Sequence, residues 1–316
     1  MPELSAPIAE PTVQDLLAAG VHFGHQSKRW NPKMKRFIFA KKNSICIIDL
    51  PKTQALLKMA RQFVYDTVAA GKGVLFVGTK RQCQELVKDA AVRCGQHYVT
   101  SRWLGGTLTN FRNISTSVAR MREIEQMQKD GEFEKLPMKE VSRLRHEMER
   151  LQKNLSGIAN MNGLPGAMVV VDVTREAIAV QEANRMSVPV VAVVDTNCDP
   201  DPIDYPIPGN DDGVRSVKLI LDTLVAAAVK AQEEYARVAA EQAAQRQAEA
   251  EAAAAKAAAQ PAAPAGDDAK PRQPRQGGGR ERRPRSSERA KAEAAAQPAA
   301  ESAPAEPASP AATPGA

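Results

Sequence analysis

The chain has 316 residues, and the composition of residues 231–316 excludes a second globular domain of ordinary kind. This segment contains 32 Ala and 10 Pro, and no Phe, Trp or Tyr follows Tyr235, so it cannot bury enough apolar surface to offset its ordering entropy. The formal net charge of +6 lies entirely in residues 1–230, because residues 231–316 hold 12 basic and 12 acidic side chains. A basic core of this size indicates a polyanionic partner.

The predicted elements alternate between helices and apolar strands along the first 235 residues. Strands are expected where short apolar runs occur, at 45–50, 73–78, 97–100, 166–173 and 188–194. Helices are expected at 13–19, 51–70, 81–93, 174–186 and from 211 towards 235, with a partial, solvent-exposed extension over 236–259. Continuous apolar strands that alternate with helices predict an α/β domain with a doubly wound parallel sheet in three layers.

An insertion at residues 109–158 has a different pattern from the rest of the core. Its apolar residues recur at steps of three and four on both sides of a turn bracketed by Gly131 and Pro137. This spacing predicts two helices zipped into an antiparallel coiled-coil hairpin. The hairpin is either a plain stabilising element or an arm that docks on a large partner. We therefore divide the chain into a core (1–230), this hairpin (109–158) and a low-complexity tail (231–316).

The four cysteines do not form a metal-binding or disulfide pattern, since no pair has C-x-x-C spacing. The N-terminus lacks the basic start and apolar stretch of a signal peptide, and no apolar run reaches the length of a membrane span. The sequence therefore predicts a reduced, soluble, cytoplasmic protein without membrane contact.

The segment Gly73–Lys80 is similar to a phosphate loop but fails its requirements. Thr79 precedes Lys80, whereas the motif has Lys before Ser or Thr, and Gly73 lies before the predicted strand instead of after it. Lys80 and Arg81 still follow a strand, where α/β folds bind ligands, so they either contact a phosphate or are merely solvated. A nucleotide- or metabolite-dependent enzyme that uses the strand ends remains the alternative function.

No convincing catalytic or metal-binding constellation occurs elsewhere. The aspartates of residues 195–204 resemble a calcium loop, but Pro200 occupies the position that requires Gly. They are interpreted as a turn-rich loop, and whether they hold a metal ion together with His22 or His25 stays open. We expect no catalytic residue, no cofactor and no small-molecule substrate.

Basic and aromatic side chains cluster in three places, which points to RNA. Lys and Arg pair with phosphates, while Trp and Phe stack on bases. The alternative for each cluster is a solvated basic loop whose aromatic residues belong to the core. The candidate RNA-binding residues are Lys28, Arg29, Trp30, Lys33, Lys35, Arg36, Lys80, Arg81, Arg102, Trp103, Asn110 and Arg112.

Six ordered motifs make the chain resemble the family of bacterial ribosomal protein two of the small subunit. They are VHFGHQSKRWNPKMKRFIF (21–39), LFVGTKR (75–81), RWLGGTLTNF (102–111), GLPGAMVVVD (163–172), VDTNCDPD (194–201) and IPGNDD (207–212). The resemblance covers roughly residues 12–230. It implies a flavodoxin-like domain with a coiled-coil hairpin between the third and fourth strands.

The resemblance also implies a structural role in the small ribosomal subunit. Its expected partners are the ribosomal RNA of that subunit and other small-subunit proteins, including the large mRNA-binding protein one, which it would help to recruit. Neither catalysis nor an obligatory nucleotide belongs to the family. The extension after about Lys230 departs from the family pattern, and its Gly277–Arg285 patch is either part of an inert tail or an accessory RNA tether.

Overall fold

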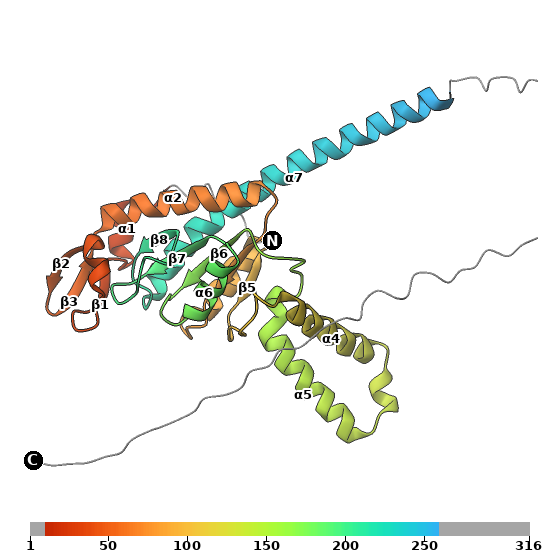
Figure 1. Cartoon of the computed structure of the whole chain (residues 1–316), viewed down its shortest axis with the longest axis horizontal. Coiled ribbons are helices and arrows are strands. Elements are labelled where there is room, and N and C mark those ends of the chain that lie inside the picture. The colour runs from red at the N-terminus through yellow and green to blue at the C-terminus, as the bar shows by residue number, and fades with distance from the viewer. Residues whose placement is uncertain (1–9, 259–316) are drawn as a thin grey trace, which may run out of the picture. The chain divides into compact units, whose positions relative to one another are not determined.

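A five-stranded parallel sheet lies at the centre of the computed structural model, which describes residues 10–258 (Figure 1). The strands are β4 (Val74–Val77), β5 (His97–Val99), β6 (Ala167–Val171), β7 (Val190–Val194) and β8 (Tyr205–Pro208). Their order is β5-β4-β6-β7-β8, and every neighbouring pair is parallel. The chain therefore reverses its direction of winding between β4 and β6, and the carboxyl ends of these strands flank the crevice where such folds place polar groups.

Helices cover both faces of this sheet, as the sequence predicts. The helices of the domain are α1 (Val13–Ala18), α2 (Leu50–Ala69), α3 (Gln84–Arg93), α6 (Ala177–Arg185) and α7 (Val214–Ala258). Helices α2, α3 and α7 bury apolar side chains against the face that carries Val74 and Phe76. Helix α6 packs on the opposite face, which carries Leu75 and Val77. Strands that are buried on both faces account for the continuous apolar runs in the sequence.

The basic segment after His22 folds into a second, smaller sheet. It contains β1 (Phe23–Gln26), the short 3-10 helix η1 (Pro32–Phe37), β2 (Ile38–Lys42) and β3 (Ile45–Ile48), and the strands pair antiparallel in the order β1-β3-β2. Asn43 and Ser44 link β2 to β3 with φ values of 51° and 59°, which are typical of a two-residue hairpin. The expectation that residues 45–50 form a strand of the parallel sheet is therefore wrong.

Strand β8 replaces that segment as the fifth strand of the parallel sheet, and the sequence prediction missed it. Pro206 and Pro208 interrupt its apolar pattern, and proline cannot donate a ladder hydrogen bond. Because β8 lies at the edge of the sheet beside β7, only one of its sides needs backbone partners. An edge position tolerates the two prolines.

The insertion between β5 and β6 forms a pair of helices, α4 (Phe111–Lys129) and α5 (Met138–Leu155). The short 3-10 helices η2 (Glu132–Lys135) and η3 (Ser156–Ile158) follow α4 and α5, respectively. The helices pack against each other and extend away from the parallel sheet in Figure 1. Their buried residues occupy the predicted seam: Ile114, Val118, Met121 and Ile124 on α4, and Val141, Leu144 and Leu155 on α5.

Helix α7 runs without interruption past the end of the globular core. The predicted extension of the last helix is present, but it is helical throughout to Ala258 where only a partial extension was expected, and residue 231 lies inside this helix. Within residues 10–258, no helix combines the length and the apolar character needed to cross a membrane. The predicted low-complexity tail beyond Ala258, with the Gly277–Arg285 patch, lies outside the described residues.

Candidate functional site

Four of the predicted RNA-binding cations are exposed around the small sheet. Lys28 and Arg29 lie in the turn after β1, and Lys35 and Arg36 lie on η1. In the part of the chain that the structure describes, none of these four side chains joins an ion pair. The guanidinium of Arg36 lies over the Phe37 ring, 4.8 Å from its centroid, but forms no ion pair there. Exposed positive charges that are not held in an ion pair can neutralise the phosphates of a polyanion.

Two other candidates in this segment have partners inside the protein. Lys33 Nζ lies 2.6 Å from a carboxylate oxygen of Asp199 and 2.6 Å from one of Asp201. Trp30 is half-buried, and Lys41 Nζ lies 3.9 Å from the centroid of its ring, which is a cation–π contact. Lys33 and Trp30 thus fix the conformation of the basic segment.

Phe39 on β2 is an exposed aromatic residue that the sequence prediction did not include among the RNA-binding candidates. Its side chain is 76% exposed, and the neighbouring Lys41 and Lys42 are exposed as well. The register between β2 and β3 shifts between Ile38 and Ala40, so Phe39 stands at a local irregularity of the ladder. A large exposed ring next to lysines has the chemistry of a base-stacking residue.

A buried carboxylate on α6 organises the loop of residues 102–110. Oε1 of Glu182 accepts hydrogen bonds from Trp103 Nε1 (3.1 Å) and the Gly106 amide (2.8 Å). Its Oε2 accepts from the amides of Leu108 (3.0 Å) and Thr109 (3.2 Å) and from the Thr109 hydroxyl (3.2 Å). Burial acts to raise the pKa of Glu182, but these hydrogen bonds outweigh burial and lower it, so the carboxylate stays ionised.

These hydrogen bonds fix the loop that carries the remaining candidate RNA-binding residues. Arg102, Asn110 and Arg112 are exposed, whereas Trp103 is only 8% exposed. The burial of Trp103 favours the alternative in which this aromatic ring belongs to the core. Glu182 was not assigned to this loop from the sequence, although its place on the helix face of Ala179 and Ala183 was a signal that it is buried.

Lys80, at the carboxyl end of β4, lies inside a cluster of aspartates. Its Nζ atom is 2.9 Å from Asp211 Oδ1, 2.7 Å from Asp212 Oδ1 and 3.5 Å from Asp172 Oδ2. Burial alone would lower the pKa of Lys80, but its hydrogen bonds to Asp212 and Asp211 raise it. Lys80 therefore serves as an internal counter-ion, while the adjacent Arg81 is exposed.

The residue before Lys80 is also engaged internally. The backbone amide of Thr79 donates to Glu176 Oε1 (3.0 Å), and the Thr79 hydroxyl accepts from Arg175 Nε (2.9 Å). Burial raises the pKa of Glu176 above its ordinary value. A phosphate loop needs free backbone amides at this turn, so the geometry agrees with the rejection of that motif from the sequence.

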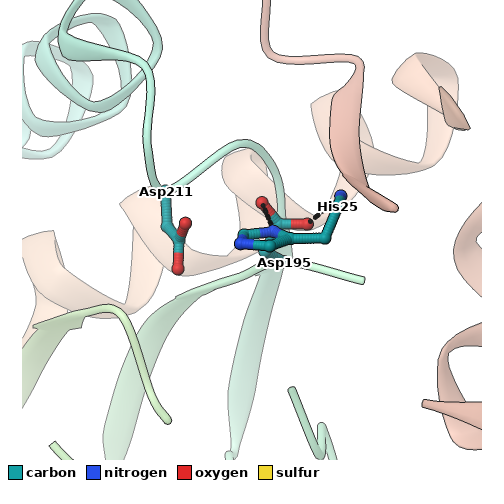
Figure 2. Close-up of side chains that lie close together, drawn as sticks. All are labelled: His25, Asp195 and Asp211. Atoms are coloured by element: carbon teal, nitrogen blue, oxygen red, sulfur yellow. Dashed lines mark hydrogen bonds and ion pairs between the residues drawn. The ribbon is translucent and has the colours of Figure 1, made fainter. Parts of the chain in front are cut away.

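His25, Asp195 and Asp211 meet at the same end of the sheet (Figure 2). His25 Nδ1 lies 3.0 Å from Asp195 Oδ2, and His25 Nε2 lies 3.4 Å from Asp212 Oδ2. The Asp195 carboxylate raises the pKa of His25. Burial, together with the charge of Asp195, raises the pKa of Asp211 to about 6, although its hydrogen bond to Lys80 acts to lower it.

The other residues that the sequence left open as metal ligands lie elsewhere. The ring centroid of His22 is 3.9 Å from that of Phe23, and Asp204 accepts a hydrogen bond from the Val190 amide (2.8 Å). Asp199 pairs with Lys33. Among the described residues of that set, only His25 and Asp195 come together.

Comparison with known families identifies the chain. The family described as Ribosomal protein S2 matches residues 16–231, which include the small sheet, the parallel sheet and the inserted helices. This match confirms the resemblance carried by the six sequence motifs. The chain belongs to the ribosomal protein S2 family, a family of structural proteins of the small ribosomal subunit.

Proposed function

We propose that the chain binds the RNA of the small ribosomal subunit through two basic surfaces. The first, the basic segment surface, comprises Lys28, Arg29, Lys35 and Arg36. The second, the loop surface, comprises Arg102, Asn110 and Arg112. Arg81 at the end of β4 is a further RNA-facing candidate. The observation that carries the proposal is the exposure of these four cations, none of which joins an ion pair among the described residues.

Charge arrangement supports phosphate contacts more than base recognition. The basic segment contains no acidic residue between His22 and Lys42, so no carboxylate within it repels the RNA backbone. Lys33, Trp30, Lys80 and Trp103 then act indirectly, because each has an intramolecular partner and holds a neighbouring loop in place. Phosphate contacts of this kind fix position and orientation without reading sequence.

Phe39 adds a second type of contact to the basic segment surface. Stacking of an unpaired base on its exposed ring needs no particular base identity, because every base has a π face. A folded RNA that presents an unpaired nucleotide beside a phosphate-rich helix suits this combination of ring and cations. We therefore assign the partner as structured ribosomal RNA.

The inserted helices and the tail complete the proposed architecture. We interpret the α/β core as flavodoxin-like and α4–α5 as a coiled-coil hairpin whose charged outer faces dock on the subunit. We assign residues 1–230 to the RNA-binding core and residues 231–316 to a low-complexity tail. Helping to dock the mRNA-binding protein one rests on family membership, as does action in the cytoplasm.

The salt dependence of RNA binding tests the proposal. The variant with Lys28, Arg29, Lys35 and Arg36 all changed to Gln is compared with wild type on small-subunit ribosomal RNA at several salt concentrations. The matched control changes four exposed cations on α3 and α7 to Gln: Lys88, Arg215, Lys218 and Lys230. Both variants lose the same net charge.

We expect only the first variant to bind more weakly and with a shallower salt dependence. The slope of log K against log salt should fall by up to about 0.9 for each phosphate that the variant no longer neutralises, taking duplex nucleic acid as a guide. Equal slopes for the first variant and wild type, or equally weakened binding in both variants, would refute the assignment of the basic segment surface.

A further inference from the structure

The carboxylates at the strand ends outnumber the cations that face them. Asp172, Asp211 and Asp212 contact the ammonium of Lys80, while Asp195 and Asp212 contact the imidazole of His25. Lys80 contacts three of these carboxylates, but no ion pair joins it to Asp195 among the described residues. Buried carboxylates are stable only when they are paired, hydrogen-bonded or bound to a metal ion.

The two carboxylate oxygens of Asp195 have different partners. The side chain is 1% exposed, and its Oδ1 accepts hydrogen bonds from the His25 amide (3.2 Å) and the Thr196 hydroxyl (3.0 Å). Its Oδ2 is buried and, among the described residues, accepts no well-aligned hydrogen bond. His25 Nδ1 lies 3.0 Å from Oδ2 and forms an ion pair with it. Oδ2 thus faces the His25 imidazole as its ion-pair partner, and Figure 2 marks this contact with a dashed line.

We propose that His25, Asp195 and Asp211 bind a Zn²⁺ ion, with one imidazole nitrogen and two carboxylate oxygens as ligands. One candidate ligand atom from each residue lies within 4.8 Å of the others, so small side-chain movements would bring all three atoms to the zinc–ligand distances of about 2.0–2.2 Å. Zn²⁺ accepts mixed imidazole and carboxylate ligands, whereas Mg²⁺ prefers oxygen and retains its waters. The hydrogen bonds on Asp195 Oδ1 supply the outer contacts that orient a metal ligand.

A second group of possible ligands at this end of the sheet fits a metal less well. Asp172, Cys198 and Asp211 also lie close together. Lys80 Nζ, however, already contacts carboxylate oxygens of both Asp172 and Asp211. A metal ion between these aspartates would face that ammonium directly. The group that contains His25 instead includes Asp195, the carboxylate that Lys80 does not contact.

The proposed site joins separate parts of the fold. His25 lies on β1 of the small sheet, Asp195 follows β7, and Asp211 lies between β8 and α7. A bound ion would therefore fasten the small sheet to the carboxyl edge of the parallel sheet. This role is structural and does not depend on whether the chain binds RNA.

Zn²⁺ titration of the purified full-length chain tests the proposal. The protein is stripped with a chelator and titrated with Zn²⁺ against a chromophoric chelator, and X-ray absorption then reports the ligand atoms. His25→Ala and Asp211→Asn are the test variants, and the second nearly preserves side-chain shape if the first disturbs folding. His146→Ala, on the exposed face of α5, is the control.

We expect one Zn²⁺ per chain, nitrogen and oxygen ligands without sulfur, and no displacement by millimolar Mg²⁺. Each test variant should bind Zn²⁺ more than about a hundredfold more weakly, while His146→Ala binds as wild type does. Zn²⁺ should also raise the thermal midpoint of wild type but not of Asp211→Asn. The absence of saturable binding, a sulfur ligand, or wild-type affinity in Asp211→Asn would each overturn the proposal.

Discussion

The prediction that tests the fold and the RNA surface together is the substitution Glu182→Gln. The native carboxylate accepts hydrogen bonds from five donors in the loop of residues 102–110. An amide keeps one acceptor oxygen and places an NH₂ group against the donors of the other oxygen. If the oxygen remains at the Trp103 and Gly106 side, the amides of Leu108 and Thr109 lose their acceptor.

The cost follows from these two donors, because the Leu108 amide is buried and the Thr109 amide is partly buried. A buried donor without a partner costs about 1–3 kcal/mol and a partly buried one costs less, so Glu182→Gln should lower the free energy of unfolding by about 1–4 kcal/mol. That is a large share of the roughly 5–15 kcal/mol that stabilises a typical domain. We expect the loop to loosen first, because the strands of the parallel sheet keep their own hydrogen bonds.

The pH dependence of stability provides an independent test of the role of Glu182. The folded pKa of Glu182 lies below its ordinary value of 4.5, so its stabilising contribution is complete above that value and is lost as the pH falls through the folded pKa. Glu182→Gln removes this titration. The variant should therefore lose less stability than wild type when the solution is acidified below about pH 4.5.

Urea denaturation and amide hydrogen exchange measure the two effects. Exchange at Gly106, Leu108 and Thr109 should accelerate in Glu182→Gln, and RNA affinity should fall because Arg102 loses its fixed position. Glu85→Gln, an exposed substitution on α3, is the control and should change stability by less than about 0.5 kcal/mol. If Glu182→Gln also stayed within that limit with its loop amides protected, the carboxylate would not be organising the loop.

Three further predictions concern other parts of the chain. Leu144→Asp puts an unpaired charge between α4 and α5 at a cost of several kcal/mol. Hydrogen exchange should then show these two helices frayed beside an intact parallel sheet, and less of the protein should be incorporated into the subunit. Normal incorporation of the frayed protein would contradict the docking role. Gly157→Ala would place its Cβ 2.1 Å from the Tyr98 carbonyl oxygen, so the free energy of unfolding should drop by more than about 2 kcal/mol in urea denaturation, and an unchanged midpoint would contradict this packing. The pKa of Asp211 is about 6 in the folded state, against an ordinary value of 3.8, so the folded state binds more protons than the unfolded state between these pH values. The free energy of unfolding of the metal-free protein should therefore fall by up to about 3 kcal/mol as the pH rises from 4 to 6. Asp211→Asn should flatten this decline in chelator-treated protein, and equal slopes for variant and wild type would contradict the raised pKa.

The strong periodic signals in the sequence predicted most of the fold. The apolar runs of β4, β6 and β7 are buried on both faces, and the heptad steps of the insertion correspond to buried residues on α4 and α5. These patterns succeed because burial imposes the same period on sequence and structure. The two prolines of β8 hid its apolar pattern, so that edge strand was missed.

The pairing of strands depends on contacts between distant segments, which a local pattern does not report. Residues 45–48 form a strand as expected, but the hairpin turn at Asn43 and Ser44 pairs it with β2 and keeps it out of the parallel sheet. That turn was a readable signal for the small sheet. The partner strand, by contrast, could not be chosen from apolar character alone.

The candidate site was predicted less completely than the fold. Exposure of Lys28, Arg29, Lys35 and Arg36 agrees with a basic segment that lacks acidic residues. The ion pairs of Lys33 and Lys80 join residues more than 90 positions apart, so composition could not distinguish these cations from free ones. The hydrogen bonds that Glu182 accepts from the loop of residues 102–110 also join distant segments. They could not be predicted from the sequence, because a single buried carboxylate forms no recognisable motif.

Sedimentation of a cell lysate through a sucrose gradient tests the central claim most directly. Chain carrying a detectable tag should migrate with the small ribosomal subunit, and the variant with Lys28, Arg29, Lys35 and Arg36 changed to Gln should shift partly to the top of the gradient. If the wild-type chain remained entirely with free proteins at the top, its proposed place as an RNA-bound component of the small subunit would be contradicted.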